Sequence, residues 1–349
     1  MCDCRASEGD DLLRHWGGFD PDEPDQETAF SFAPHFLLAA VGRLWLCAYG
    51  CLFFCGLAER SLNNKPEGIM IPTIPESNYE AHFYAYPHLH AVSAFRIWGN
   101  LYYVGDDNVG IHLIDTGDGL ILIDSGYPEK QAWLVQNIWQ LGFQPSMIRY
   151  LVHTHAHFDH VGCTNLLCQL SPDMKTCLSS TDTKMMRDTP ELVFADCHAF
   201  RHDCFFTPDI ELNDGDEIRL GRTRLWVRAA PGHTMGTLAV FAAVQDGSQE
   251  YIAGLHGGLG YNTLSKQFLE KYRICGAREA FRTQLRELQD LPVDIVLGNH
   301  TKQIDFLKKM NTLLSNPDQP NPFLDSTYWN RLLRKVQADF AAFEQRDPL

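Results

Sequence analysis

The sequence predicts a layered α/β fold built around one large domain. Apolar runs with the length and composition of strands alternate with stretches of helical periodicity through most of the 349-residue chain. Gly117, Asp118 and Gly119 separate two of these runs and predict a hairpin. The predicted strands are 101–105, 111–115, 120–124, 148–152, 175–178, 217–220, 224–228, 238–244, 250–253 and 293–297. The predicted helices are 128–142, 161–171, 181–188, 265–289 and 302–314.

A final amphipathic helix is predicted from about Asp325 to Glu344, with Asp325 or Ser326 capping its start. Its apolar residues recur at three- and four-residue spacing and form one stripe, which we expect to pack on the core. These residues are Trp329, Leu332, Leu333, Val336, Phe340 and Phe343.

A dense group of metal-ligand side chains follows the predicted strand 148–152. His155, His157, Asp159 and His160 fall within six residues, directly after the apolar run. Neutral imidazole and carboxylate are good ligands for zinc and similar divalent metals. Burying so many polar groups beside a strand would be costly without a partner. The segment therefore predicts a metal site at the end of a strand.

Two isolated histidines occur later in the same local setting. His233 comes after the alternating run 224–228, and His300 comes after the apolar run 293–297. Glycine stands next to or near each of them and permits a tight turn. We expect both histidines to converge on the first cluster, so that all the ligands belong to one domain.

These residues resemble the metallo-β-lactamase superfamily, whose signature is His-x-His-x-Asp-His followed by later single histidines. The resemblance covers roughly residues 80 to 346. It implies a four-layer αββα sandwich. Residues 120–126 also look like the family's strand and Asp-Thr-Gly turn, with Ser125 in place of threonine. Asp124 would then not bind a metal directly but would orient a ligand or support the metal-binding loop.

The resemblance implies two Zn2+ ions. The first would be held by His155, His157 and His233, and the second by Asp159, His160 and His300. Related di-iron proteins usually carry glutamate where this chain has His157. Histidine favours zinc, and manganese and iron stay open as alternatives.

Many superfamily members have an aspartate that bridges both metals, and the matching position here is Leu255. Leucine cannot bind a metal, so only water or hydroxide would bridge the pair unless His256 moves in. This difference argues against glyoxalase-II-like thioesterases and many lactonases as models for the function of this chain, because these enzymes use the bridging aspartate. It favours the lactamase subclass that has a three-histidine site beside an Asp-His-His site.

Further features resemble that subclass, including Gly260-Tyr261 and the segment 321–325. The subclass tends to carry serine after the fourth strand, where this chain has Leu255 and His256. This change puts inherited substrate contacts in doubt. Position alone suggests His256, Tyr261 and Asn262 as substrate-binding residues, with Arg273 as a further candidate for a substrate carboxylate.

The implied function is that of a zinc-dependent hydrolase. Two divalent ions about 3.5–4 Å apart lower the pKa of bound water to about 7, and the resulting hydroxide would attack a carbonyl. A β-lactam or similar small cyclic amide is the first candidate substrate. Asp159, which would orient the hydroxide, and Asp124 are the expected catalytic residues. The alternatives are a lactonase or another small ester or thioester hydrolase of the superfamily, and a non-catalytic metal-binding protein.

The catalytic domain is expected to span residues 78–349. Residues 1–35 form an acidic segment that we expect to be disordered, and residues 59–77 form a linker. Between them, residues 36–58 are apolar, and the run 36–57 is long enough to span a bilayer although Arg43 interrupts it.

Three interpretations of the apolar segment stay open. It could be a membrane anchor or internal signal, a helix packed on the protein, or an extension absent from a working protein translated from Met70. A native anchor predicts a membrane-associated or exported protein, and otherwise we expect a cytoplasmic one.

The net charge of -15 argues against nucleic acid as a partner. A surface that binds phosphate needs clustered lysine and arginine, and the sequence has no such run. We therefore expect a small-molecule substrate, and the sequence does not predict an oligomeric state.

Overall fold

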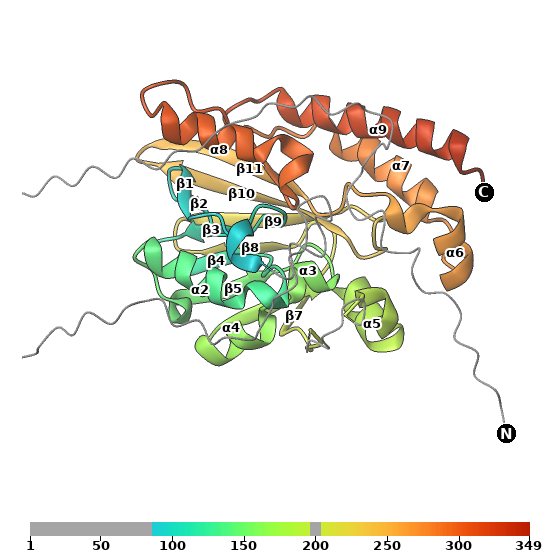
Figure 1. The fold of residues 1–349 in the computed structure, drawn as a ribbon, viewed down its shortest axis with the longest axis horizontal. Helices are drawn as coiled ribbons and strands as arrows, with labels where there is room; N and C mark the ends of the chain where they lie inside the picture. The colour runs from blue at the N-terminus through green and yellow to red at the C-terminus, as the bar shows by residue number, and fades with distance from the viewer. Residues whose placement is uncertain (1–85, 196–203) are drawn as a thin grey trace, which may run out of the picture.

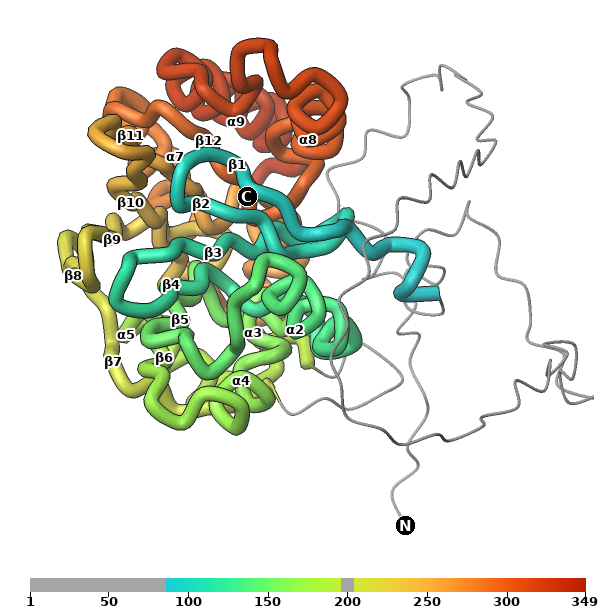
Figure 2. Tube along the Cα trace, turned by 90° about the vertical axis from the view of Figure 1, so that its left-hand side faces the viewer, coloured from blue at the N-terminus to red at the C-terminus, as the bar shows by residue number. Residues whose placement is uncertain are grey.

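The computed structural model describes residues 86–195 and 204–349, which form two β-sheets packed face to face (Figures 1 and 2). The seven-stranded sheet has the order β1 (Phe95–Trp98), β2 (Leu101–Tyr103), β3 (His112–Asp115), β4 (Leu120–Ile123), β5 (Ile148–Val152), β6 (Lys175–Ser179) and β7 (Ile210–Leu212). The five-stranded sheet has the order β12 (Ile295–Gly298), β11 (Gln249–His256), β10 (Leu238–Asp246), β9 (Thr223–Ala229) and β8 (Glu217–Leu220).

Helices cover the outer faces of both sheets (Figure 1). The first sheet is accompanied by α2 (Gln131–Gln140), α3 (Phe158–Val161), α4 (Thr164–Leu170) and α5 (Ser180–Asp188). The second sheet is covered by α7 (Ala277–Leu288), α8 (Phe306–Ser315) and α9 (Tyr328–Arg346), and α6 (Lys266–Tyr272) lies beyond α7. The predicted four-layer αββα sandwich is therefore confirmed.

Strand β4 shows how the layers are held together. Ile121 and Ile123 belong to the apolar cluster between the sheets, whereas Leu120 and Leu122 belong to the cluster beneath the outer helices. Successive side chains of a strand point to opposite faces, so a strand buried on both faces reads as one continuous apolar run. The run 120–123 has this pattern because helices cover its outer face.

The predicted strands are confirmed with small differences at their ends, and so is the hairpin between β3 and β4. The structure adds two strands that the sequence analysis missed, β1 and β7. Each is short and lies at an edge of the first sheet. With four and three residues, these runs are too short for their alternation to predict a strand.

Three predicted helices are divided in the structure. The predicted helix 265–289 was wrong as a single element, because Arg273 and Gly276 adopt left-handed backbone conformations (φ 55° and 76°) and separate α6 from α7. Asp305 (φ 52°) likewise separates the 3-10 helix η6 (Thr301–Ile304) from α8. The predicted helix 161–171 begins earlier, at Phe158, and forms α3 and α4.

The C-terminal helix α9 has the predicted apolar stripe but a different start. Its residues Trp329, Leu333 and Phe340 are fully buried. The helix begins at Tyr328, and neither Asp325 nor Ser326 is its N-cap. Asp325 instead accepts hydrogen bonds from the backbone N–H and the hydroxyl of Thr327 and stabilises the turn before the helix.

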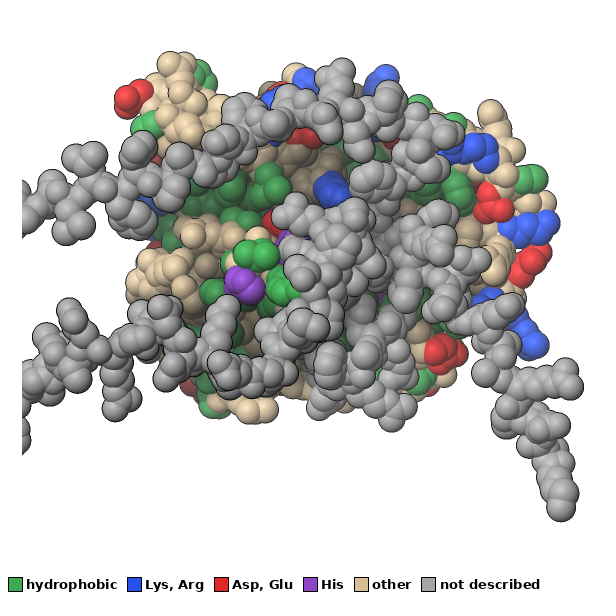
Figure 3. Space-filling view, in the orientation of Figure 1, with side chains coloured by type: hydrophobic (Ala, Val, Ile, Leu, Met, Phe, Trp, Pro, Cys, Tyr) green, Lys and Arg blue, Asp and Glu red, His purple; other side chains and the backbone are tan. Residues whose placement is uncertain are grey.

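The described surface carries charges of both signs. On the face shown in Figure 3, acidic and basic side chains are interspersed around the edge. Within the described ranges, no helix combines the length and apolar character needed to cross a membrane. The expectations for residues 1–35, 36–58 and 59–77 concern segments outside the described residues.

Candidate metal centre

Three segments that are distant in the sequence meet at one end of the sandwich. Strand β5 leads into the loop with His155 and His157, and α3 follows with Asp159 and His160. His233 lies on the loop between β9 and β10.

His300 follows β12 and joins this end of the sandwich through a backbone bridge with Val109. Parallel strands β4 and β5 end side by side, so Asp124 lies next to the start of the histidine-rich loop.

The first ligand group consists of His155, His157 and His233. One side-chain nitrogen of each lies within 4.8 Å of the others, and all three residues are buried. Nε2 of His155 is 3.0 Å from Nδ1 of His157, and the ring of His233 packs edge-on against both. Three imidazoles that face one point have the donor set of a zinc site.

The second group consists of Asp159, His160 and His300, whose ligand atoms also lie within 4.8 Å of one another. Oδ2 of Asp159 is 3.4 Å from Nε2 of His160 and 3.5 Å from Nε2 of His300. Among the described residues, neither oxygen of Asp159 has a hydrogen-bond partner although both are buried. A buried carboxylate without donors is costly, and a bound cation would remove that cost.

The two groups adjoin each other. The rings of His155 and His160 lie 4.2 Å apart between centroids, and one comes from each group. The six residues therefore form one continuous cluster made of two adjoining groups of ligand atoms.

Asp124 fixes the orientation of ligands in both groups. Its Oδ2 lies 2.9 Å from Nδ1 of His160 and 2.9 Å from the hydroxyl of Thr154. The hydroxyl of Thr154 donates to Asp124, so the Nδ1–H of His155 donates to the same hydroxyl across 3.0 Å. Both histidines consequently carry a proton on Nδ1, so Nε2 is the nitrogen that each would offer to a metal in the cluster.

The later histidines are oriented in the same way by other groups. Nδ1 of His233 donates to the carbonyl of Gly260 at 2.8 Å. Nδ1 of His300 lies 3.2 Å from Oδ1 of Asn108, whose amide nitrogen donates to the hydroxyl of Tyr127. In both rings Nε2 is then the nitrogen available for a metal, and that of His300 lies 3.3 Å from Nε2 of His160.

Burial keeps most of the histidines in the form that binds metal. It lowers the pKa of His155 and His157 well below the ordinary value, and it lowers the pKa of His233 and His300 to about 4. Burial also lowers the pKa of His160, but the neighbouring Asp159 and Asp124 outweigh it and raise that pKa to about 10. A metal binding at Nε2 of His160 would replace the proton held there.

Asp182 connects the two loops of the three-histidine group, and the sequence analysis missed it. It lies on α5 and accepts hydrogen bonds from the backbone N–H of Ala156 (3.0 Å), the hydroxyl of Thr234 (2.8 Å) and the backbone N–H of Gly236 (2.9 Å). Ala156 stands between His155 and His157, and Thr234 follows His233. Asp182 therefore holds these ligand loops at a fixed separation.

Two of the candidate substrate residues are engaged by other parts of the fold. His256 is buried, with Nε2 2.8 Å from Gln284 and Nδ1 accepting from the backbone of Gly258. Both ring nitrogens are engaged, so His256 does not move in to bridge the metals. Tyr261 packs against Phe343 of α9.

Asn262 begins the 3-10 helix η5 (Asn262–Leu264). Leu255 is fully buried in the core between the sheets. The predicted substrate contacts of His256, Tyr261 and Asn262 stay predictions, since none of the three lines the pocket beside the histidines.

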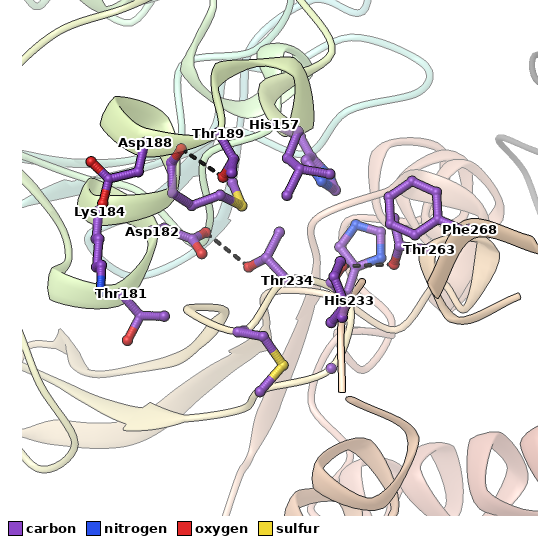
Figure 4. Close-up of a pocket in the computed structure, with 15 residues that line it drawn as sticks. His157, Thr181, Asp182, Lys184, Asp188, Thr189, His233, Thr234, Thr263 and Phe268 are labelled. Carbon is purple, nitrogen blue, oxygen red and sulfur yellow. Dashed lines mark hydrogen bonds between the residues drawn. The ribbon is translucent and has the colours of Figure 1, made fainter. Parts of the chain in front are cut away.

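That pocket, of about 260 Å³, opens beside His157 and His233. The two rings lie near its centre, with Phe268 of α6 on one side and Lys184 of α5 on the other (Figure 4). Thr234 and Asp182, which are joined by a hydrogen bond, form part of the pocket wall.

Comparison with known proteins agrees with this geometry. Residues 104–246 match the family model of the Metallo-beta-lactamase superfamily. The native FEZ-1 metallo-beta-lactamase from Legionella gormanii is 29% identical, with a TM-score of 0.66 over 74% of this chain and 98% of that one. The class B3 di-zinc metallo-beta-lactamase LRA-12 from an Alaskan soil metagenome is 25% identical, with a TM-score of 0.65 over 78% and 98% of the two chains.

A further relative is the hydroxyacylglutathione hydrolase of Chelativorans sp. (strain BNC1). It is 26% identical over 263 residues, which cover 68% of this chain and 92% of the relative. The family, the fold and these similarities support a metal-dependent hydrolase. On the family match, the αββα architecture and the structural similarity to these two enzymes, this chain contains a domain of the metallo-beta-lactamase superfamily.

Proposed function

We propose that this protein is a hydrolase that binds two zinc ions, with His155, His157 and His233 at one site and Asp159, His160 and His300 at the other. The observation that carries the proposal is the buried carboxylate of Asp159, which accepts no hydrogen bond from the described residues and lies 3.4 and 3.5 Å from Nε2 of His160 and His300. A carboxylate without hydrogen bonds is costly to bury in an apolar core, and a bound cation would offset that cost.

The side chains around the ligands support this assignment. Asp124, Gly260 and Asn108 each engage Nδ1 of a histidine, directly or through Thr154, and so direct Nε2 toward the cluster. Two divalent ions held there would supply a nucleophilic water at neutral pH and polarise a substrate carbonyl. Asp159 would act as ligand and orient the attacking group, and Asp124 would position His160 and His155.

A β-lactam or similar small cyclic amide is the proposed substrate class. Leucine at position 255 would leave the metal pair without a bridging carboxylate, and the two similar structures are described as metallo-beta-lactamases. The likeness to a hydroxyacylglutathione hydrolase favours a second candidate, hydrolysis of a small ester or thioester, including lactones. A metal-binding protein without turnover is the third.

One experiment separates these candidates. The zinc-loaded protein would be assayed against β-lactams, lactones and thioesters, each with and without a chelator. We expect lactam hydrolysis that the chelator abolishes and added zinc restores. Turnover of thioesters alone would favour the second candidate, and two bound metals without turnover of any substrate would favour the third. A hydrolysis rate that the chelator does not change would overturn the proposal.

A further inference from the structure

The pocket beside the three-histidine group has a mostly apolar wall. It lies between α5, the loop that carries His233, and α6 (Figure 4). Its apolar side chains come from each of these segments and from the turns after α5 and α6: Met185, Leu192, Met235, Phe268 and Ile274. Apolar clefts with a few convergent polar groups are the usual form of small-molecule sites.

Three of the polar side chains on this wall are occupied by other groups of the protein. The carboxylate of Asp182 already accepts its three hydrogen bonds. The hydroxyl of Thr263 donates to the carbonyl of His233 at 2.6 Å, and Asp188 is paired with Arg187 at 2.8 Å. These groups therefore have little capacity left for a polar ligand, and the wall favours an apolar one.

We propose that this pocket holds an apolar acyl group of the substrate, so that the enzyme prefers esters and amides of hydrophobic acids. The inference rests on the proposed function, because the substrate carbonyl would lie at His157 and His233, where the pocket opens. A cavity of about 150 Å³ is known to hold benzene. At about 260 Å³, this pocket has space for a hexanoyl group.

Hydrolysis of p-nitrophenyl acetate and p-nitrophenyl hexanoate by the zinc-loaded protein tests the preference. Water supplies the new C–O bond of the acid and the proton of the released nitrophenol, so no other reactant is needed. Each buried methylene is worth roughly a threefold to fourfold rate factor. We therefore expect kcat/KM for the hexanoate to exceed that for the acetate at least tenfold.

Two methionines of equal exposure provide the variant and its control. Met235 lines the pocket and is 39% exposed, whereas Met147 lies outside it and is 38% exposed. We expect Met235→Glu to bring the hexanoate-to-acetate ratio of kcat/KM close to one, and Met235→Leu to preserve it. Met147→Glu should change neither the ratio nor the rates.

Calorimetric titration with hexanoate and acetate, which resemble the acid products, gives a readout independent of turnover. We expect hexanoate to bind at least tenfold more tightly, and Met235→Glu to abolish the difference. If this binding pattern appears without chelator-sensitive hydrolysis, the pocket assignment holds and the proposed function fails. If hydrolysis is chelator-sensitive but both esters and both acids behave alike, the pocket assignment is overturned and the hydrolase stands.

Discussion

Oδ2 of Asp124 lies 2.9 Å from Nδ1 of His160, and the same oxygen accepts a hydrogen bond from the hydroxyl of Thr154. Asp124 itself adopts a left-handed backbone conformation with φ 60°. Such a conformation is costly for a residue with a side chain and persists where its surroundings hold it in place. The carboxylate of Asp124 therefore positions one ligand in each group, His160 directly and His155 through Thr154.

Thr154→Val tests this relay. Valine keeps the shape of threonine but removes the hydroxyl between Asp124 and Nδ1 of His155. Loss of such a supporting contact typically lowers metal affinity about 10- to 100-fold. We expect that loss in a competition titration with zinc, and we expect Thr154→Ser to recover most of the affinity. Equal affinity in the valine variant and the wild type would contradict the relay.

Asp182→Ala should destabilise the protein and weaken the three-histidine site. The change leaves the backbone N–H groups of Ala156 and Gly236 buried without acceptors, at about 1–3 kcal/mol each. We expect the free energy of unfolding, measured with urea and chelator present, to fall by about 2–6 kcal/mol. Asp188→Ala on the exposed face of the same helix is the control, and an equal effect of the two substitutions would refute this role.

Asp106 predicts a pH dependence of stability. Burial raises its pKa from 3.8 to about 7, although Lys130 opposes the shift. The folded state then binds the proton more tightly than the unfolded state. The stabilisation is complete below about pH 4 and is lost as the pH rises to about 7.

Asp106→Asn removes this titration and keeps an oxygen that accepts from the backbone of Asn108 and Val109. We expect the variant to gain about 2 kcal/mol relative to the wild type between pH 5 and pH 8, measured by urea unfolding with chelator. Parallel pH profiles for the two proteins would show that Asp106 does not titrate in this range.

A pair of tryptophans tests the packing of α9. Trp329 is 1% exposed, and its Nε1–H donates to the carbonyl of Leu288 at 2.8 Å, whereas Trp139 on α2 is 61% exposed. Trp329→Ala is expected to cost about 3–5 kcal/mol of unfolding free energy. Trp139→Ala should change it by about 0.5 kcal/mol or less. Similar losses at both positions would contradict the buried role of α9.

The sequence predicted the metal cluster because residue type and local setting coincide there. His155, His157, Asp159 and His160 are ligand types placed directly after an apolar strand, and a strand end is where parallel sheets gather side chains. The strands were predicted for a similar reason, since their apolar pattern follows directly from burial on one or both faces of the sheet.

The missed features depend on contacts between distant residues. Asp182 has partners 26, 52 and 54 residues away, two of which are backbone groups that carry no signature in the sequence. Arg273 ends α6 in a conformation usually adopted by glycine. His256 has the residue type of a ligand, but its hydrogen bond to Gln284 on α7 commits it to the core.

The metal content of the zinc-saturated protein tests the central claim most directly. After removal of free metal, the wild type is expected to hold two zinc ions per chain. Asp159→Ala, which removes the carboxylate without a donor, should hold one and lose its hydrolytic activity. Asp159→Ala with two zinc ions and full activity would contradict the account, as would a wild type that retains no zinc.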